Sequence, residues 1–301
     1  MIGKLIIRQP LVIHLLRLLT LIFLCQESVA NTITIMHRAP DSVNDKRQEY
    51  NTALLKLALA KTLKPGEEIE YKSIPQVSLA RARSLLNTNK FPNLIMELTY
   101  EDELSQNSSI DYIAFPIELG ALSYRICFVS PEFEASKEKI ESMDDLKKKS
   151  YATGIGWAEN YIFRENELRV VEVNSYENIF KMLFNNRFDF FCRGASEIYR
   201  EYQTFGSQYQ LHLDKTFLIH YDIPRFFYLN KSNQELKQRL ELGLKTAFND
   251  GSLLKLWNQH FAASIKFAAL KNRRLFELEN THINNINRDY EKYLMPLHTY
   301  D

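Results

Sequence analysis

The sequence predicts an α/β protein with largely parallel sheets. Short apolar runs alternate along the chain with longer amphipathic segments, which is typical of strands and helices that follow one another. After Pro131 the sequence becomes charged and polar, and Pro224 stands just before a later strand-like run. We interpret these two points as crossings between two lobes, where an inserted middle segment would leave a cleft with two hinges.

The first 30 residues have the pattern of a secretory signal peptide. Lys4 and Arg8 give a positive start, an apolar stretch follows over residues 11–24, and Ser28-Val29-Ala30 supplies small residues for cleavage. The apolar stretch is short and interrupted for a membrane span. We therefore expect export to the periplasm with cleavage near Ala30, the alternative being an uncleaved signal anchor.

Element by element, the first half of the remaining chain begins with a strand at residues 33–36. Residues 47–62 form a helical pattern whose inner stripe includes Tyr50, Leu54 and Ala58, and Pro65-Gly66 then turns the chain. A short helix is expected at residues 77–86. The further strands expected from apolar or alternating runs are residues 68–72, 93–96, 110–117 and 124–129.

The second half continues the alternation. A short helix starts near Met143, and longer helical patterns cover residues 176–184, 195–202, 232–249 and a segment around 253–257. Strands are expected at residues 150–155, 169–173, 188–194, 211–218 and 225–229. The tail from residue 268 to 301 is polar and helix-prone.

Charge and cysteine content narrow the class of protein. Without Lys4, Arg8, Arg17 and Glu27, the chain keeps 35 basic and 36 acidic side chains, so it has no basic field for nucleic acid. Cys127 and Cys192 both lie in apolar strand-like runs. We expect them to be buried small hydrophobic residues rather than a disulfide, because pairing would need the fold to bring them within bonding distance.

The segment 188–194 is the most informative part of the chain. Phe188-Asp189-Phe190-Phe191-Cys192 reads as a buried parallel strand and ends at Arg193-Gly194. Ligands of open α/β sheets lie beyond the carboxyl ends of the strands, so a fixed cation there suggests an anion site. The alternative is a solvated loop arginine.

The order of several motifs resembles the extracellular solute-binding proteins of family 3. Ser142-Met143-Asp144-Asp145-Leu146, Met182-Leu183-Phe184 before Asp189, and Asp250-Gly251-Ser252 are similar to family segments. Gly120-x-x-x-Tyr124-Arg125 and Phe191-Cys192-Arg193-Gly194 before Glu197-Ile198 resemble a divergent branch with a transporter-type binding domain. The resemblance covers residues 31–265 and implies the two-lobed periplasmic binding protein-like type II fold with two hinge crossings. It implies a first lobe of residues 31–130 and 224–265, a second lobe of residues 131–223, and a C-terminal helical extension over residues 266–301.

Two departures set this chain apart from family members that bind amino acids. Asp102 follows Thr99-Tyr100-Glu101, where the family carries an arginine that clamps a carboxylate, and Arg193-Gly194 replaces the aspartate that takes the ammonium. A free amino acid is therefore not the expected ligand. The candidate ligand-binding residues are His37, Arg38, Glu97, Thr99, Arg125, Gly156, Trp157, Arg193 and Glu197. Arg125 and Arg193 would hold an anion, Glu197 would orient Arg193, and Trp157 would stack on the ligand or lie in the core.

Signals for an enzyme are weak. The seven histidines lack metal spacing, no G-x-S-x-G elbow occurs, and Gly154-Ile155-Gly156 lacks the third glycine of a dinucleotide loop. We expect a monomeric, non-enzymatic binding protein without cofactor or metal. It would bind a small, anionic or zwitterionic solute for an inner-membrane ABC transporter or a sensor. The alternatives are an extracytoplasmic protein-interaction subunit and, less favoured, an enzyme on the same fold.

Overall fold

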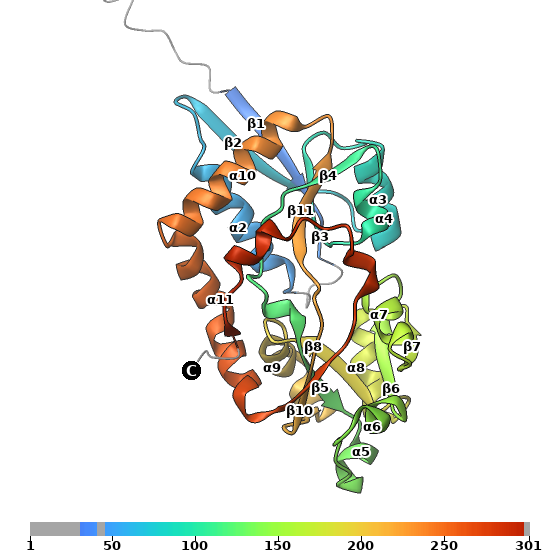
Figure 1. The fold of residues 1–301 in the computed structure, drawn as a ribbon. Coiled ribbons are helices and arrows are strands. Elements are labelled where there is room, and N and C mark those ends of the chain that lie inside the picture. The colour runs from blue at the N-terminus through green and yellow to red at the C-terminus, as the bar shows by residue number, and fades with distance from the viewer. Residues whose placement is uncertain (1–30, 41–45, 298–301) are drawn as a thin grey trace, which may run out of the picture.

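The computed structural model describes residues 31–40 and 46–297, arranged around two β-sheets that lie one above the other in Figure 1. The expected signal peptide falls outside the described residues. The α/β class is confirmed, because helices cover both sheets, but both sheets are mixed rather than largely parallel. Within the described part of the chain, no helix has both the length and the apolar character needed to cross a membrane.

The first sheet has the strand order β2-β1-β3-β11-β4. Its strands are β1 (Asn31–His37), β2 (Glu67–Ser73), β3 (Leu94–Thr99), β4 (Ile110–Tyr112) and β11 (Arg225–Asn230). β1 runs parallel to β2 and β3, whereas the late strand β11 enters antiparallel between β3 and β4. The helices of this unit are α2 (Gln48–Ala60), α3 (Leu79–Asn87), α4 (Asp102–Ser105) and α10 (Gln234–Asn249).

Alternation along β3 and β11 divides the first core in two. Ile95 and Phe227 belong to the apolar cluster that contains α2 and α10 residues, whereas Met96 and Phe226 belong to the cluster with α3. A period of two places successive side chains on opposite faces, so each face of this sheet carries its own helical layer.

The second sheet has the order β12-β10-β5-β8-β6-β7, with β9 pairing with β5. Its strands are β5 (Tyr124–Val129), β6 (Ser150–Gly154), β7 (Arg169–Val173), β8 (Phe190–Gly194), β9 (His212–Leu213), β10 (Phe217–His220) and β12 (Arg274–Glu277). Its helices are α5 (Pro131–Ser136), α6 (Met143–Lys147), α7 (Glu159–Glu165), α8 (Tyr176–Phe184) and α9 (Ile198–Tyr209). The single strand expected at residues 211–218 is two strands, because the Asp214 carboxylate accepts bonds from the backbone of Thr216 and Phe217 and turns the chain.

The expectation of two unpaired cysteines is wrong. Cys127 on β5 lies directly opposite Cys192 on the antiparallel strand β8, and the two form a disulfide. Their Cα atoms are 3.8 Å apart across 65 residues of sequence. Sheet order, rather than sequence spacing, brings them together.

Up to β11, the chain crosses twice between the two sheets. The chain leaves the first sheet after β4 and returns before β11, but β5 already belongs to the second sheet. The first lobe was expected to extend to residue 130, but β5, which lies before that residue, is a strand of the second sheet. The reason is that Ile126, Cys127 and Phe128 are fully buried and pair with β8.

The C-terminal region differs from the helical extension expected over residues 266–301. Helix α11 (Ser252–Ala268) is followed by the short 3-10 turn η2 (Leu270–Asn272) and by β12, which pairs in parallel with β10. Two further short 3-10 helices follow, η3 (Thr281–Ile283) and η4 (Arg288–Tyr293). In place of the expected polar helix, Phe276 is buried in the core beside the second sheet, and Ile283, Ile286 and Tyr290 are buried in the cluster with α3.

Candidate ligand-binding cleft

A hollow of about 660 Å³, including space open to solvent, lies between the two sheets. Arg38 and Thr99 come from the carboxyl ends of β1 and β3 in the first sheet, and Trp157 and Arg193 from the ends of β6 and β8 in the second. A larger hollow of about 1760 Å³ continues outward and shares Arg38 and Trp157 with the first. Because the carboxyl ends of parallel strands carry the binding groups in open α/β sheets, this hollow is the candidate site.

Seven of the nine residues singled out from the sequence line the inner hollow: Arg38, Glu97, Thr99, Gly156, Trp157, Arg193 and Glu197. His37 and Arg125 do not line it. The His37 ring nitrogen Nδ1 lies 3.1 Å from the carbonyl of Arg38, at the end of β1.

Glu97 and Thr99 project into the cleft because they alternate on β3. In the ladder they stand opposite Phe227 and Arg225 of β11. Burial raises the pKa of the Glu97 carboxyl, and its Oε1 atom has no hydrogen-bond partner. A carboxyl group in this position can exchange hydrogen bonds with a polar ligand group.

Trp157 is positioned by the two glycines before it. Its indole lies directly on Gly154, where a Cβ atom would collide with the ring. Gly156 has a φ of +75°, a left-handed conformation that glycine adopts without strain. The resulting tight turn, in which the Trp157 amide donates to the Gly154 carbonyl at 3.2 Å, places a partly buried indole in both hollows.

Arg193 is held by carboxylates from the helix that follows it. Its Nε donates to both carboxylate oxygens of Glu201 at 2.9 Å, and its Nη2 lies 2.8 Å from Glu197. Its guanidinium also lies 4.9 Å from the centre of the Trp157 ring. Burial alone would lower the pKa of Arg193, but Glu197 and Glu201 hold it above its ordinary value.

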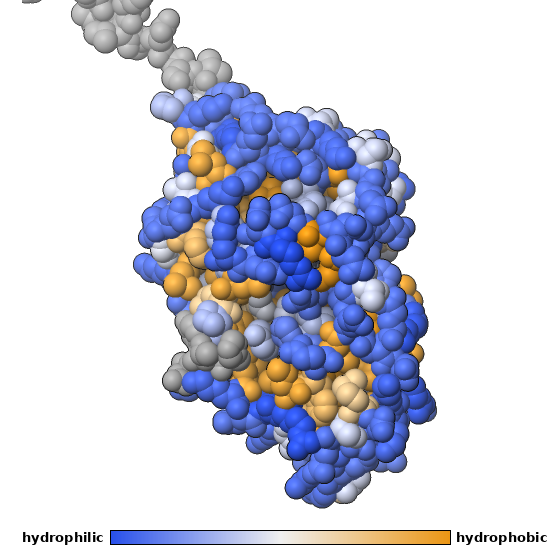
Figure 2. Space-filling model, in the orientation of Figure 1, coloured by the Kyte–Doolittle hydropathy of each residue, from blue (hydrophilic) through white to orange (hydrophobic). Residues whose placement is uncertain are grey.

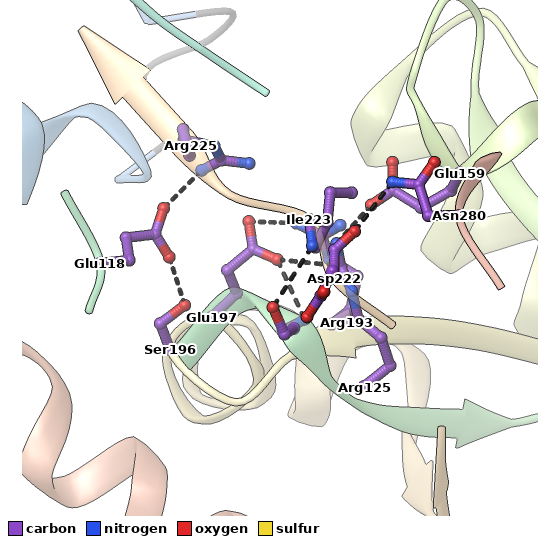
Figure 3. Close-up of polar contacts among 12 residues, drawn as sticks. Glu118, Arg125, Glu159, Arg193, Ser196, Glu197, Asp222, Ile223, Arg225 and Asn280 are labelled. Atoms are coloured by element: carbon purple, nitrogen blue, oxygen red, sulfur yellow. Dashed lines mark hydrogen bonds and ion pairs between the residues drawn. The ribbon is translucent and has the colours of Figure 1, made fainter. Parts of the chain in front are cut away.

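Arg125 lies deeper still and is completely buried. Its Nη2 is 2.8 Å from Glu159 and its Nη1 is 3.7 Å from Glu197 (Figure 3). The centre of the Tyr221 ring lies 5.2 Å from the guanidinium. The expectation that both guanidiniums face the cleft therefore fails for Arg125, because the carboxylates of α7 and α9 surround it instead.

On the side of the cleft formed by the second lobe, two guanidiniums and three carboxylates are buried close together. The carboxylates are Glu159, Glu197 and Glu201, each almost fully enclosed. Burial alone would raise the pKa of the Glu197 carboxyl, but the nearby arginines, Arg193 foremost, lower it below its ordinary value. This side of the cleft therefore carries both carboxylate and guanidinium groups.

Sequence reasoning missed several polar residues that line the cleft. Arg47 begins α2 and lies 4.1 Å from the Tyr176 ring of the second unit, and Arg83 of α3 pairs with Glu101 at 2.6 Å. Arg225 on β11 pairs with Glu118 at 2.7 Å (Figure 3). Arg47 could have been found, because a helix that follows a strand begins at the same sheet edge where that strand ends.

Formal charge differs between the two walls. Among the lining residues of the inner hollow, those of the first lobe, which form the first wall, are Arg38, Arg47, Arg83 and Arg225 against Glu97. Those of the second lobe, which form the second wall, are Arg193 against Glu159 and Glu197. The first wall is thus cationic and the second slightly anionic.

The described residues contain no group of three or more histidine, cysteine, aspartate or glutamate side chains arranged to hold a metal ion.

Comparison with solved structures shows what this architecture is. A putative binding component of an ABC transporter from Wolinella succinogenes, complexed with lysine, matches with a TM-score of 0.58 at 16% identity. The match covers 77% of this chain and 96% of that one. The chain has the fold of the periplasmic binding proteins.

Two other solved structures share this fold, and they are described as a binding protein and a sensor domain. An ancestral arginine-binding protein bound to arginine has a TM-score of 0.55 and 17% identity, over 77% of this chain and 99% of that one. A histidine kinase sensor domain with similarity to periplasmic binding proteins has a TM-score of 0.54 and 12% identity, over 77% and 96%. No family model and no curated protein matches the sequence. The resemblance stated from the sequence is confirmed in its fold.

Proposed function

We propose that the protein is a periplasmic solute-binding protein that closes its two lobes over one small anionic or zwitterionic solute. It would act as a monomer and deliver the solute to an inner-membrane transporter or report it to a sensor. The observation that carries the proposal is a hollow lined from both sheets at the carboxyl ends of their strands.

The charges of the walls suggest how a zwitterion would be oriented. Its anionic group would face the arginines of the first wall, of which Arg83 is one, since guanidinium forks match carboxylate or phosphate geometry. Its cationic group would face Glu159 and Glu197. Trp157 would pack on the part of the ligand between them.

Contacts between the lobes describe the state that the ligand would stabilise. Arg200 of α9 donates to the Lys46 carbonyl at 2.9 Å and pairs with Glu49 of α2 at 3.0 Å. Arg47 stacks on Tyr176 across the same gap. Opening the cleft breaks these contacts, and a ligand favours closure only through its higher affinity for the closed form.

The disulfide supports export. Disulfides persist in oxidising compartments such as the periplasm, and this one joins two central strands. Mass spectrometry of the protein recovered from the periplasm tests this point. We expect a mature start near Asn31 and a mass lower by two protons than that of the reduced chain.

Thermal-shift screening against a panel of amino acids, dicarboxylates, phosphate esters and short peptides tests the binding function. A ligand at 100 times its dissociation constant stabilises the folded state by about 2.7 kcal/mol. The hits are then measured by calorimetry with Trp157→Ala and Glu159→Gln, and with Glu132→Gln on exposed α5 as the control. Loss of affinity in the first two alone supports the assignment, whereas equal affinity in all three contradicts it.

A second candidate function is that of a sensor subunit that contacts another protein. The histidine kinase sensor domain among the neighbours favours it. Copurification with a membrane kinase in the absence of any stabilising solute would favour this candidate over the first.

A further inference from the structure

The last described segment, residues 274–297, which we call the strap, connects both lobes. It starts as β12 on the edge of the second sheet and runs up the front of the molecule to the first unit, shown in dark red in Figure 1. In the space-filling view of this face, hydrophobic residues appear along the middle and lower part, within a mostly hydrophilic surface (Figure 2).

The first part of the strap is attached to the second lobe. The carboxylate of Glu165, at the end of α7, accepts a bond from Thr281 Oγ1 at 2.7 Å and lies 2.8 Å from His282 Nε2. The His282 ring lies 3.8 Å from the ring of Tyr161 on the same helix. Asn166 adds two bonds to the backbone of Glu279.

The next part is attached to the first lobe. Ile283, Ile286 and Tyr290 are buried in the apolar cluster that contains α3 and β11 residues. The Tyr290 ring lies 5.4 Å from Phe226, and the backbone amide of Asn285 donates to the Asp102 carboxylate of α4 at 3.1 Å.

The strap also covers the crossings between the lobes. Arg288 pairs with Asp222 at 2.7 Å, just before β11, and Asn280 donates to the Asp222 carbonyl at 2.8 Å. Further on, the Met295 amide donates to the Leu119 carbonyl at 3.0 Å, in the other crossing.

The decisive feature is that the two anchors are adjacent in sequence. His282 is attached to α7 of the second lobe, and the next residue, Ile283, is 2% exposed in the core of the first. One peptide unit spans about 3.8 Å, so no slack lies between them. We propose that the strap is a tether that limits the separation of the two lobes on the side of α4 and α7.

By excluding widely open conformations, the tether lowers the free energy needed to reach the closed form in the absence of ligand. Binding-competent molecules then form a larger fraction of the population, and the apparent dissociation constant falls in proportion. Neighbours of the same fold are covered over 96–99% of their length by 77% of this chain, so part of this chain lies outside the shared fold. The tether is a conformational property of the chain and does not depend on the identity of the ligand.

Spin labels across the mouth of the cleft test the tether without a ligand. Arg81→Cys on α3 and Asn178→Cys on α8 place one exposed label on each lobe, in the protein from residue 31 onward, which lacks Cys25, with the native disulfide intact. A six-residue Gly-Ser insertion between residues 282 and 283 keeps both anchors and adds about 20 Å of slack. The control is the same insertion between residues 137 and 138, in an exposed loop of the second lobe.

Electron-electron distance measurements are expected to show a population at longer distances in the first insertion variant only. A second variant, Asn166→Ala/Thr281→Ala/His282→Ala, removes the side-chain contacts that attach the strap to the end of α7 and should shift in the same direction. It decides the matter if the insertion prevents folding, as judged by circular dichroism. Distances equal to those of the unmodified chain in every folded variant would overturn the proposal.

Discussion

The guanidinium of Arg193 lies 4.9 Å from the centre of the Trp157 ring, while Glu197 and Glu201 pair with its nitrogens. This arrangement makes Arg193 a support for the wall of the cleft. The indole stands over a buried charge that two carboxylates neutralise, so the position of Trp157 depends on the ion pairs behind it.

Replacement of Arg193 by alanine should therefore destabilise the fold. It leaves Glu197 and Glu201 enclosed without their main counter-charge, and removing one partner of a buried pair costs about 3–5 kcal/mol. Urea unfolding followed by circular dichroism measures the change. Lys137→Ala, which removes an exposed pair with Glu134, should alter the free energy of unfolding by less than about 1 kcal/mol. Equal effects of the two substitutions would contradict the buried-pair interpretation.

The disulfide should contribute strongly to stability. It closes a loop between residues 65 positions apart, for which chain entropy gives about 4 kcal/mol. The double variant Cys127→Ala/Cys192→Ala is expected to unfold at a lower urea concentration by a corresponding amount, and a reducing agent should shift the unmodified chain similarly. The same reducing agent should leave the double variant unaffected, and a shift there would point to a different cause.

Two helical glycines form a matched pair for testing helix packing. A Cβ atom at Gly243 of α10 would collide with the backbone carbonyl of Ala58 in α2, so Gly243→Ala should cost about 1–3 kcal/mol. At Gly206 of α9 the nearest atoms belong to Tyr202 at 3.4 Å, an ordinary contact. Gly206→Ala should raise stability by up to about 1 kcal/mol, since alanine favours a helix. Thermal melts of the two variants should thus move in opposite directions.

Glu97 should make stability depend on pH. Because burial raises its pKa, the folded protein keeps a proton that the unfolded chain releases from about pH 4 upward. Its contribution to stability is therefore lost as the pH rises through the folded-state pKa. Glu97→Gln should be more stable than the unmodified protein at pH 8, with the difference shrinking toward pH 4. Urea midpoints across this range provide the measurement, and a difference that grows on acidification would refute the assignment.

Much of the fold could be predicted because its strands are short apolar runs between amphipathic helices. The segment 188–194 was expected as a buried strand, and β8 occupies residues 190–194 at the centre of the second sheet. The short helices α5 and α7 were not predicted, since six or seven residues carry too few apolar positions to show a period.

The site could be predicted in its location but less well in its electrostatics. Strand ends identified Arg38, Thr99, Trp157 and Arg193, because sheet topology determines which ends meet. The partners of Arg193 depend on how α9 packs against β8, and the partner of Arg125 depends on α7. Such pairings, like the disulfide, come from contacts across the sheet that spacing along the chain does not reveal.

The late arrival of β11 has a consequence for biosynthesis. This strand fills the place between β3 and β4, although more than a hundred residues separate them from it in sequence. While the chain is still being made, the edges of β3 and β4 therefore stay open until residues 225–230 emerge, and open edges invite pairing with other chains. We expect the nascent protein to need a holding chaperone during this interval, and its first half to be insoluble when produced by itself.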